Sequence, residues 1–353
     1  MSSRLEPGAV YARKDVFPRQ DSVRSNMINN NRVIMRQLDC KGIADSVLRE
    51  CREEAASLRA RGVIPKLAMI RVGEKGPDLS YEKGATRMLQ DAGIETEVFA
   101  YAEDVSQEVY IRELQERNAD PSIHGILPFL PLDHIDAQAA VGNVLLPEKD
   151  VDAATPANLG KVLSGDPTAM VPCTAAAILE ILDRHAAEIA EIRKQNDPWY
   201  DPDTQDVWTG LKVCIVNYSD RIGRPLAALL TERYALVSIL RRRLSAEERG
   251  GIASQADILI AASPKRNSIS EEMVKPGAMV IDASTIREKL FDENGEPIIN
   301  KATGKQKTGV FGCCTKEAAA KAALITPVPG VGSITSAMLA VNLIRACKLQ
   351  THT

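Results

Sequence analysis

Short apolar runs alternate along this chain with stretches in which apolar residues recur every three or four positions. The runs at 67–72 and 213–216 are typical of buried β-strands, whereas 43–58 and 107–118 have the spacing of amphipathic helices. Strands that alternate with helices form mostly parallel sheets, because each return to a parallel strand needs a crossover connection. The pattern therefore predicts an α/β protein.

The predicted elements fall into two series that meet near residue 173. The first series contains helices at 43–58, 81–92, 107–118 and 132–144 and strands at 67–72, 97–100 and 125–127. The second contains helices at 174–189 and 222–232 and strands at 213–216, 237–240, 256–262 and 278–282. We expect two α/β domains, residues 33–173 and a Rossmann-like domain at 174–335. An apolar-striped helix at 336–348 closes the chain, and we expect the segment 336–353 to return to the first domain.

Three segments lie outside these two series. Residues 1–32 contain five arginines interrupted by acidic residues and prolines, which favours a poorly ordered or partner-binding arm over an organelle-targeting peptide. The polar, tryptophan-containing stretch 194–210 is predicted as a surface loop. Residues 291–307, centred on an Asp-Glu-Asn-Gly sequence, are predicted as a hairpin.

The composition is that of a globular protein and favours a small-molecule partner. Of 353 residues, 44% are hydrophobic and 26% are charged, close to globular averages. A net charge of -3 provides no basic field for nucleic acid or an anionic membrane, and no apolar run reaches the ~20 residues of a membrane-spanning helix. Seven scattered cysteines without CxxC pairs indicate a reduced, cytoplasmic protein.

No metal site is expected. Three of the four histidines, His124, His134 and His185, lie without ligand spacing. The adjacent Cys313 and Cys314 are expected to point apart, and no histidine lies near them in the sequence.

The segment after the strand at 213–216 is a candidate nucleotide-binding turn. It carries only one of the three glycines of the Rossmann fingerprint. However, Pro225 suits the first turn of a helix, and the preceding amides and Ser219 can face an anion at that helix N-terminus. Arg241, Arg242 and Arg243 follow the next strand, where arginines favour a ribose 2′-phosphate. The alternative for the first segment is an ordinary strand-to-helix turn, and the alternative for the three arginines is a solvated basic turn.

Several further segments read individually as turns and caps, but their order along the chain is distinctive. They are Tyr81, Gly125–Leu127 with Leu130–Leu132, Lys149–Asp152, Pro172–Thr174, Ser219–Pro225, Lys275–Gly277 and Thr326–Gly330. As an ordered set these segments resemble the methylenetetrahydrofolate dehydrogenase/cyclohydrolase family. The resemblance extends over residues 33–348, nearly the whole chain.

The resemblance implies a folate-binding first domain, a second domain that binds NAD or NADP, a cleft between them, and a homodimer formed through the nucleotide domain. Tyr81 would stack on the pterin and Asp152 would hold its ring, and these two are the predicted catalytic residues. The predicted substrate site adds Leu130, Pro131, Pro327, Pro329 and Gly330. The predicted cofactor site contains Tyr218, Ser219, Arg221, Ile222, Gly223, Arg241, Arg242 and Thr335.

Departures from the family pattern bear on the reaction. The essential lysine of the family, four residues after the tyrosine, is Ala85 here, and its glutamine partner is Phe129. Lys83 is two positions away, a helical rotation of about 200°. Moving a hydride from 5,10-methylenetetrahydrofolate to a nicotinamide needs positioning, whereas hydrolysing the methenyl product needs proton transfer.

We therefore expect an NAD(P)-dependent methylenetetrahydrofolate dehydrogenase whose cyclohydrolase activity is weak or absent, a pattern similar to the monofunctional branch. That branch favours NAD, whereas the arginines favour NADP, which we prefer slightly. The alternatives are a bifunctional enzyme that uses Lys83 and a non-catalytic folate- or nucleotide-binding paralogue. Other departures are Asn217 and Tyr218 for Gly and Arg in the cofactor loop, and Ala153 for the glycine after Asp152.

Overall fold

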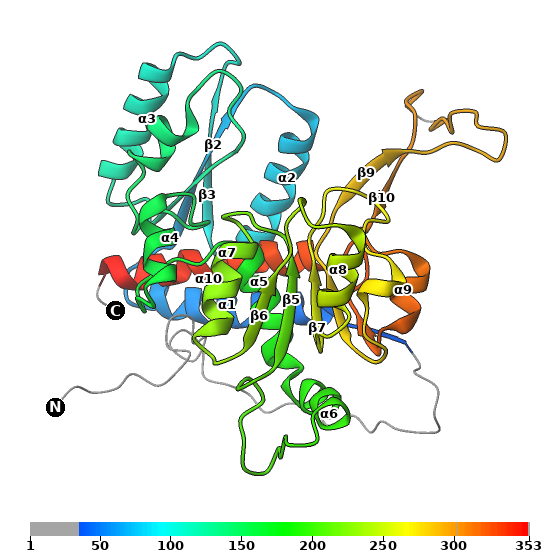
Figure 1. The fold of residues 1–353 in the computed structure, drawn as a ribbon. Coiled ribbons are helices and arrows are strands. Elements are labelled where there is room, and N and C mark those ends of the chain that lie inside the picture. The colour runs from blue at the N-terminus through cyan, green and yellow to red at the C-terminus, as the bar shows by residue number, and fades with distance from the viewer. Residues whose placement is uncertain (1–34, 302, 352–353) are drawn as a thin grey trace.

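The computed structural model describes residues 35–301 and 303–351, so the predicted arm at 1–32 lies outside the described residues. Two parallel sheets, each flanked by helices, make up the molecule (Figure 1). The α/β fold predicted from the hydrophobic pattern is confirmed. Among the described residues, no helix is long and apolar enough to cross a membrane.

The first sheet has three parallel strands with β2 (Lys66–Val72) between β3 (Glu95–Tyr101) and β4 (Gly125–Pro128). Leu67 to Ile70 are almost wholly buried, as the continuous apolar run of a parallel strand requires. The crossover helices are α2 (Gly76–Asp91) and α3 (Gln107–Ala119), and α1 (Cys40–Ala60) precedes β2.

The second sheet has six parallel strands in the order β1-β11-β8-β7-β5-β6. Their bounds are β1 (Arg36–Gln37), β5 (Lys212–Val216), β6 (Leu236–Ile239), β7 (Ile258–Ala261), β8 (Met279–Asp282) and β11 (Leu324–Ile325). The helices of this region are α7 (Gly223–Thr231), α8 (Ala246–Ala253), α9 (Lys316–Lys321) and a 3-10 turn η4 (Glu271–Met273). Since β1 precedes the first sheet in sequence, the described part of the chain begins at the edge of the second sheet before it forms the first.

Packed helices connect the two sheets. The last helix, α10 (Val331–Thr351), packs against α1 and against α5 (Cys173–Arg184). Its Asn342 is fully buried, and the side-chain amide donates to the carbonyl oxygens of Val151 and Val171, at 2.8 Å each. The predicted return of the C-terminal helix to the first sheet region is confirmed.

The prediction of a helix at 132–144 is wrong. Only a π-helical turn, η3 (Gln138–Gly142), forms there. The Asp136 carboxylate accepts hydrogen bonds from the amides of Gln138 and Ala139 and so begins the turn locally. The residues before Asp136 are irregular.

The helix predicted at 174–189 is two helices. The ring nitrogen Nδ1 of His185 lies 2.8 Å from the Ile181 carbonyl oxygen, which the amide of residue 185 would bond in an unbroken helix. A second helix, α6 (Ala186–Asn196), then extends into the stretch predicted as loop, so the loop begins at 197. The sequence pattern also missed α4 (Pro156–Leu163), α8 and α9, which are short.

The predicted hairpin forms an arm that projects from the second sheet (Figure 1). Its base is the antiparallel pair β9 (Ile286–Lys289) and β10 (Thr308–Phe311), and residues 290–301 and 303–307 extend beyond the pair.

Candidate active site

Helix α2 presents Tyr81 and Ala85 one turn apart on the same face. Ala85 is only 4% exposed, and Phe129, from the segment after β4, is buried in the same core cluster. The Tyr81 and Phe129 rings meet edge to face, with centroids 5.6 Å apart. Lys83 is exposed. The face of α2 next to Tyr81 is therefore apolar where the family resemblance leads to a lysine and a glutamine.

Asp152 is held by two segments that come from elsewhere in the chain. One carboxylate oxygen, Oδ1, accepts a hydrogen bond from the amide of Cys173 at 3.0 Å. The other, Oδ2, lies 2.6 Å from Nη1 of Arg221, which also donates to the main-chain oxygen of Asp152 at 2.7 Å. The predicted pterin residue therefore contacts the loop predicted to bind the cofactor.

Tyr81 lies within electrostatic reach of this cluster. Loss of surrounding solvent raises the pKa of its hydroxyl, Cys173 and Asp152 raise it further, and Arg221 lowers it. The residue nevertheless keeps 42% of its surface exposed. We conclude that the hydroxyl lies near Cys173, Asp152 and Arg221, while part of the residue stays open to solvent.

The loop between β5 and α7 is closed on itself by Asn217. The side-chain oxygen of Asn217 accepts hydrogen bonds from the amide and the hydroxyl of Ser219, at 2.7 Å each, and from the amide of Gly223 at 3.2 Å. A Cβ on Gly223 would lie 2.2 Å from the Asn217 carbonyl oxygen, so the loop requires glycine there. The amide of Ile222 donates to the Ser219 hydroxyl. These donors were predicted to face an anion, and in this structure they bond within the loop.

The predicted adenosine end of the cofactor site is an exposed cationic surface. Tyr218 is 42% exposed, and the Arg241 guanidinium lies 4.2 Å from its ring centroid. Arg224 approaches the same ring at 5.1 Å and pairs with Asp220. Arg242 is exposed beside Arg241.

The turn at 326–330 is fixed to the second sheet. Thr326 bonds the backbone of Asp282 through its hydroxyl, which accepts from the amide and donates to the carbonyl oxygen. A Cβ on Gly330 would lie 2.3 Å from the Pro327 carbonyl oxygen. The peptide bonds before Pro329 and Pro131 are both cis. Thr335, predicted to contact the cofactor, lies within α10, where its hydroxyl donates to the Val331 carbonyl oxygen.

The adjacent cysteines do not point apart, so that expectation is wrong. Asp282, Cys313 and Cys314 bring one oxygen and two sulfur atoms within 4.8 Å of one another. The Asp282 carboxylate accepts from the amides of Ser284, Cys313 and Cys314. A hydrogen bond with Cys313, followed by burial, raises the pKa of Cys314. The hydrogen bonds from the Cys313 and Cys314 amides to Asp282 anchor the chain after β10.

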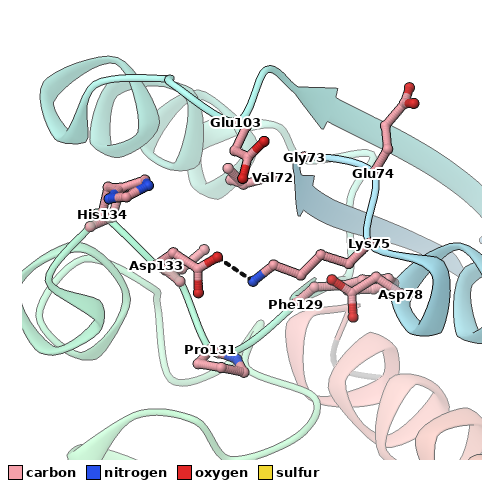
Figure 2. Close-up of a pocket in the computed structure, with 12 residues that line it drawn as sticks. Val72, Gly73, Glu74, Lys75, Asp78, Glu103, Phe129, Pro131, Asp133 and His134 are labelled. Atoms are coloured by element: carbon pink, nitrogen blue, oxygen red, sulfur yellow. Dashed lines mark ion pairs between the residues drawn. The ribbon is translucent and has the colours of Figure 1, made fainter.

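A pocket of about 230 Å³ is lined in part by Phe129 and Pro131 (Figure 2). It opens where β2 ends and α2 begins, and an ion pair between Lys75 and Asp133 crosses it at 2.6 Å. The sequence pattern gave no signal for this pair, because the two residues are separated by the first crossover and most of the first sheet. Neither Tyr81 nor Asp152 lines the pocket.

Comparison with known proteins matches both halves of the chain to one family. Residues 38–152 match the tetrahydrofolate dehydrogenase/cyclohydrolase catalytic domain, and residues 203–351 match the NAD(P)-binding domain of the same family. The bifunctional protein FolD of Clostridioides difficile (strain 630) is 36% identical over 313 residues, which cover 88% of this chain and 96% of that protein.

Solved structures agree with this match. A methylenetetrahydrofolate dehydrogenase-cyclohydrolase (FolD) from Trypanosoma brucei, complexed with NADP and an inhibitor, has a TM-score of 0.74 at 28% identity and covers 90% of this chain and 99% of its own. A 5,10-methylenetetrahydrofolate dehydrogenase from the silkworm Bombyx mori has a TM-score of 0.73 at 27% identity and covers 91% of this chain and 100% of its own.

Proposed function

Because the chain belongs to the tetrahydrofolate dehydrogenase/cyclohydrolase family, we propose that it oxidises 5,10-methylenetetrahydrofolate to 5,10-methenyltetrahydrofolate with NADP and hydrolyses the product weakly or not at all. The chain is an oxidoreductase of this family, and its second domain binds NAD(P). The cofactor preference and the weak hydrolysis are the proposal.

The observation that carries the weak hydrolysis is the apolar pair Ala85 and Phe129 beside Tyr81. Hydrolysis of the methenyl product needs a group that activates water and moves protons. Ala85 and Phe129 can do neither, and both are buried. Lys83 is exposed on a continuous helix, two positions from the required place, which argues against its use in the same role.

Hydride transfer makes smaller demands on the protein. When bound, the nicotinamide supplies the hydride acceptor, and no proton has to move because the positive charge of the product is shared by two nitrogens. The protein must hold the two reactants close and aligned. In our proposal the exposed ring of Tyr81 stacks on the folate, Asp152 accepts hydrogen bonds from the pterin, and Leu130, Pro131 and the turn at 327–330 shape the substrate side.

The preference for NADP rests on charge at the predicted adenosine end. Arg241 stacks on Tyr218, and Arg242 is exposed beside it, so two guanidinium groups are available to a 2′-phosphate. The relative from T. brucei was solved with NADP. We expect a lower KM for NADP than for NAD, and a selective rise in the NADP value in Arg242→Ala. A preference for NAD that persists in Arg242→Ala would contradict the assignment.

The bifunctional reading is the second candidate, and the names of the relatives favour it. It is tested with 5,10-methenyltetrahydrofolate as the substrate and no nicotinamide present. The proposal predicts decay at or close to the uncatalysed rate, with no change in Lys83→Ala. Decay that the enzyme accelerates, and that is lost in Lys83→Ala, would instead establish the bifunctional enzyme.

We further propose a cytoplasmic homodimer. The edge strand β6 carries Leu236 with 58% of its surface exposed, and pairing with a second copy would cover it. All seven cysteines are described and none forms a disulfide, as the reducing cytoplasm favours. Sedimentation of the purified protein checks the dimer, and Leu236→Glu is expected to shift it toward monomer. The domain boundaries near residues 173 and 335 remain predictions.

A further inference from the structure

Arg221 belongs to the loop predicted to bind the cofactor, but its side chain bonds Asp152 instead. Its Nη1 lies 2.6 Å from Oδ2 of Asp152 and 2.7 Å from the main-chain oxygen of the same residue. Asp152 follows the first sheet, and Arg221 follows β5 of the second. The contact therefore links the two predicted ligand sites directly.

The bonds to Asp152 leave room for a ligand. The Cys173 amide donates to Oδ1 and Arg221 to Oδ2, and the Cys173 thiol also interacts with the carboxylate. A carboxylate offers about four lone-pair sites, so it can still accept a further N–H group. Two donors from different segments also fix the plane of the carboxylate. Asp152 is thereby prepared to accept an N–H group, such as one that a pterin ring presents.

The strength of the ion pair does not explain its presence. The side chains of Arg221 and Asp152 are 37% and 29% exposed, and pairs open to solvent contribute little to stability. Its effect is on geometry and on local charge. A guanidinium can hold a carboxylate but does not relay a proton.

The local charge matters because the apolar face of α2 supplies none. Arg221 acts electrostatically on the Tyr81 hydroxyl as well, where it lowers the pKa against the opposing effects of burial and Asp152. Ala85, on the same face of α2 as Tyr81, carries no charge. The cation at this end of the site therefore comes from the second sheet.

We propose that Arg221 is a positioning residue for the folate, which fixes the Asp152 carboxylate for the pterin, and that it does not bind the cofactor phosphates. This inference rests on the proposed function, since it takes a folate as the ligand of Asp152. It assigns Arg221 differently from the family resemblance, which grouped it with the cofactor loop.

The test compares Arg221→Ala and Arg221→Lys with a control, Arg266→Ala, by steady-state kinetics and by calorimetric binding of tetrahydrofolate and NADP. Arg266 forms an ion pair of similar exposure with Glu288 at the base of the projecting arm. In Arg221→Ala we expect the folate KM and the tetrahydrofolate Kd to rise about tenfold, the scale of one lost charge-assisted hydrogen bond. The NADP Kd is expected to stay within about twofold, a change too small to reflect a lost phosphate contact.

Two further variants separate positioning from a general structural role. Arg221→Lys keeps the cation and should recover part of the folate affinity. Asp152→Asn should weaken folate binding less in the Arg221→Ala background than in the wild type, because Asp152 has already lost its Arg221 partner in that background. Equal effects in the two backgrounds, a folate Kd no different from that of Arg266→Ala, or a rise confined to the NADP Kd would each overturn the proposal.

Binding data keep this test distinct from the test of the reaction. If the wild type binds tetrahydrofolate but transfers no hydride, the proposed function fails while the comparison of Arg221 variants still decides the role of Arg221. A wild type that does not bind tetrahydrofolate overturns both.

Discussion

Asn342 connects the last helix to the site, and its replacement by leucine has a calculable effect. Its amide nitrogen donates to the carbonyl oxygens of Val151 and Val171, and all three groups are buried. Leucine has nearly the same volume but removes the amide donor from both carbonyl groups, and the Val151 oxygen keeps only the Cys173 thiol, at 3.5 Å.

The loss of each buried partner costs roughly 1–3 kcal/mol. The Asn342 side-chain oxygen has no hydrogen-bond partner in the structure, so its removal offsets part of this loss. We expect Asn342→Leu to lower the free energy of unfolding by about 3 kcal/mol, with two carbonyl groups losing a donor and one unpaired oxygen removed.

The same substitution should affect the site, because Val151 immediately precedes Asp152 and Val171 lies two residues before Cys173. With the anchor gone, we expect the folate KM to rise several-fold while the NADP KM stays unchanged. Urea unfolding followed by circular dichroism and steady-state kinetics provide the two measurements.

Ser336→Ala is the control on the same helix, since the Ser336 hydroxyl bonds an exposed carbonyl group. It should change the unfolding free energy by less than about 0.5 kcal/mol. A change in Asn342→Leu as small as that of the control would refute the hydrogen-bond argument. A large loss of stability with an unchanged folate KM would refute the link to the site.

Three other substitutions test separate parts of the structure. Ala85→Lys combined with Phe129→Gln should give measurable hydrolysis of 5,10-methenyltetrahydrofolate while oxidation persists, because a proton-transfer group is restored; hydrolysis at the uncatalysed rate would count against our reading of α2. Burial lowers the pKa of His124 from 6.5, so the unfolded chain takes up the proton first and stability should fall as pH drops below about 6.5; His124→Phe should flatten this part of the stability profile measured by urea unfolding. Gly223→Ala should raise the NADP Kd, because its Cβ would lie 2.2 Å from a backbone oxygen of the loop, whereas Gly251→Ala meets nothing within 4 Å and should leave the Kd unchanged; equal Kd values in calorimetry would show that the loop is not strained.

The strands were predictable because a buried parallel strand has an almost continuous apolar run, as 67–70 and 258–261 do. Short helices were harder to predict. The eight residues of α4 depend on a cap from Thr155 and a proline in the first turn, and these two residue types are equally typical of a loop. The edge strand β1 has only two residues, so its hydrophobic pattern carries no signal.

The ordered motifs identified the candidate site, but not how its parts meet. Asp152 and Arg221 are 69 residues apart and belong to loops that follow strands of different sheets, so only the fold brings them into contact. The partners of Ser219 were also out of reach, because Asn217 satisfies the donors that a helix N-terminus would otherwise offer to a ligand. Residue identity shows that position 85 carries no proton-transfer group, but it does not show which groups pair in the fold.

Turnover of 5,10-methylenetetrahydrofolate by the purified full-length protein, with reduced nicotinamide and the methenyl product followed separately, tests the central proposal most directly. We predict that NADP is reduced and that methenyltetrahydrofolate accumulates in equal amount, decaying only at its uncatalysed rate. Methenyltetrahydrofolate that disappears faster than this would contradict the inference from Ala85 and Phe129, and the absence of reduced cofactor with both NAD and NADP would contradict the dehydrogenase itself.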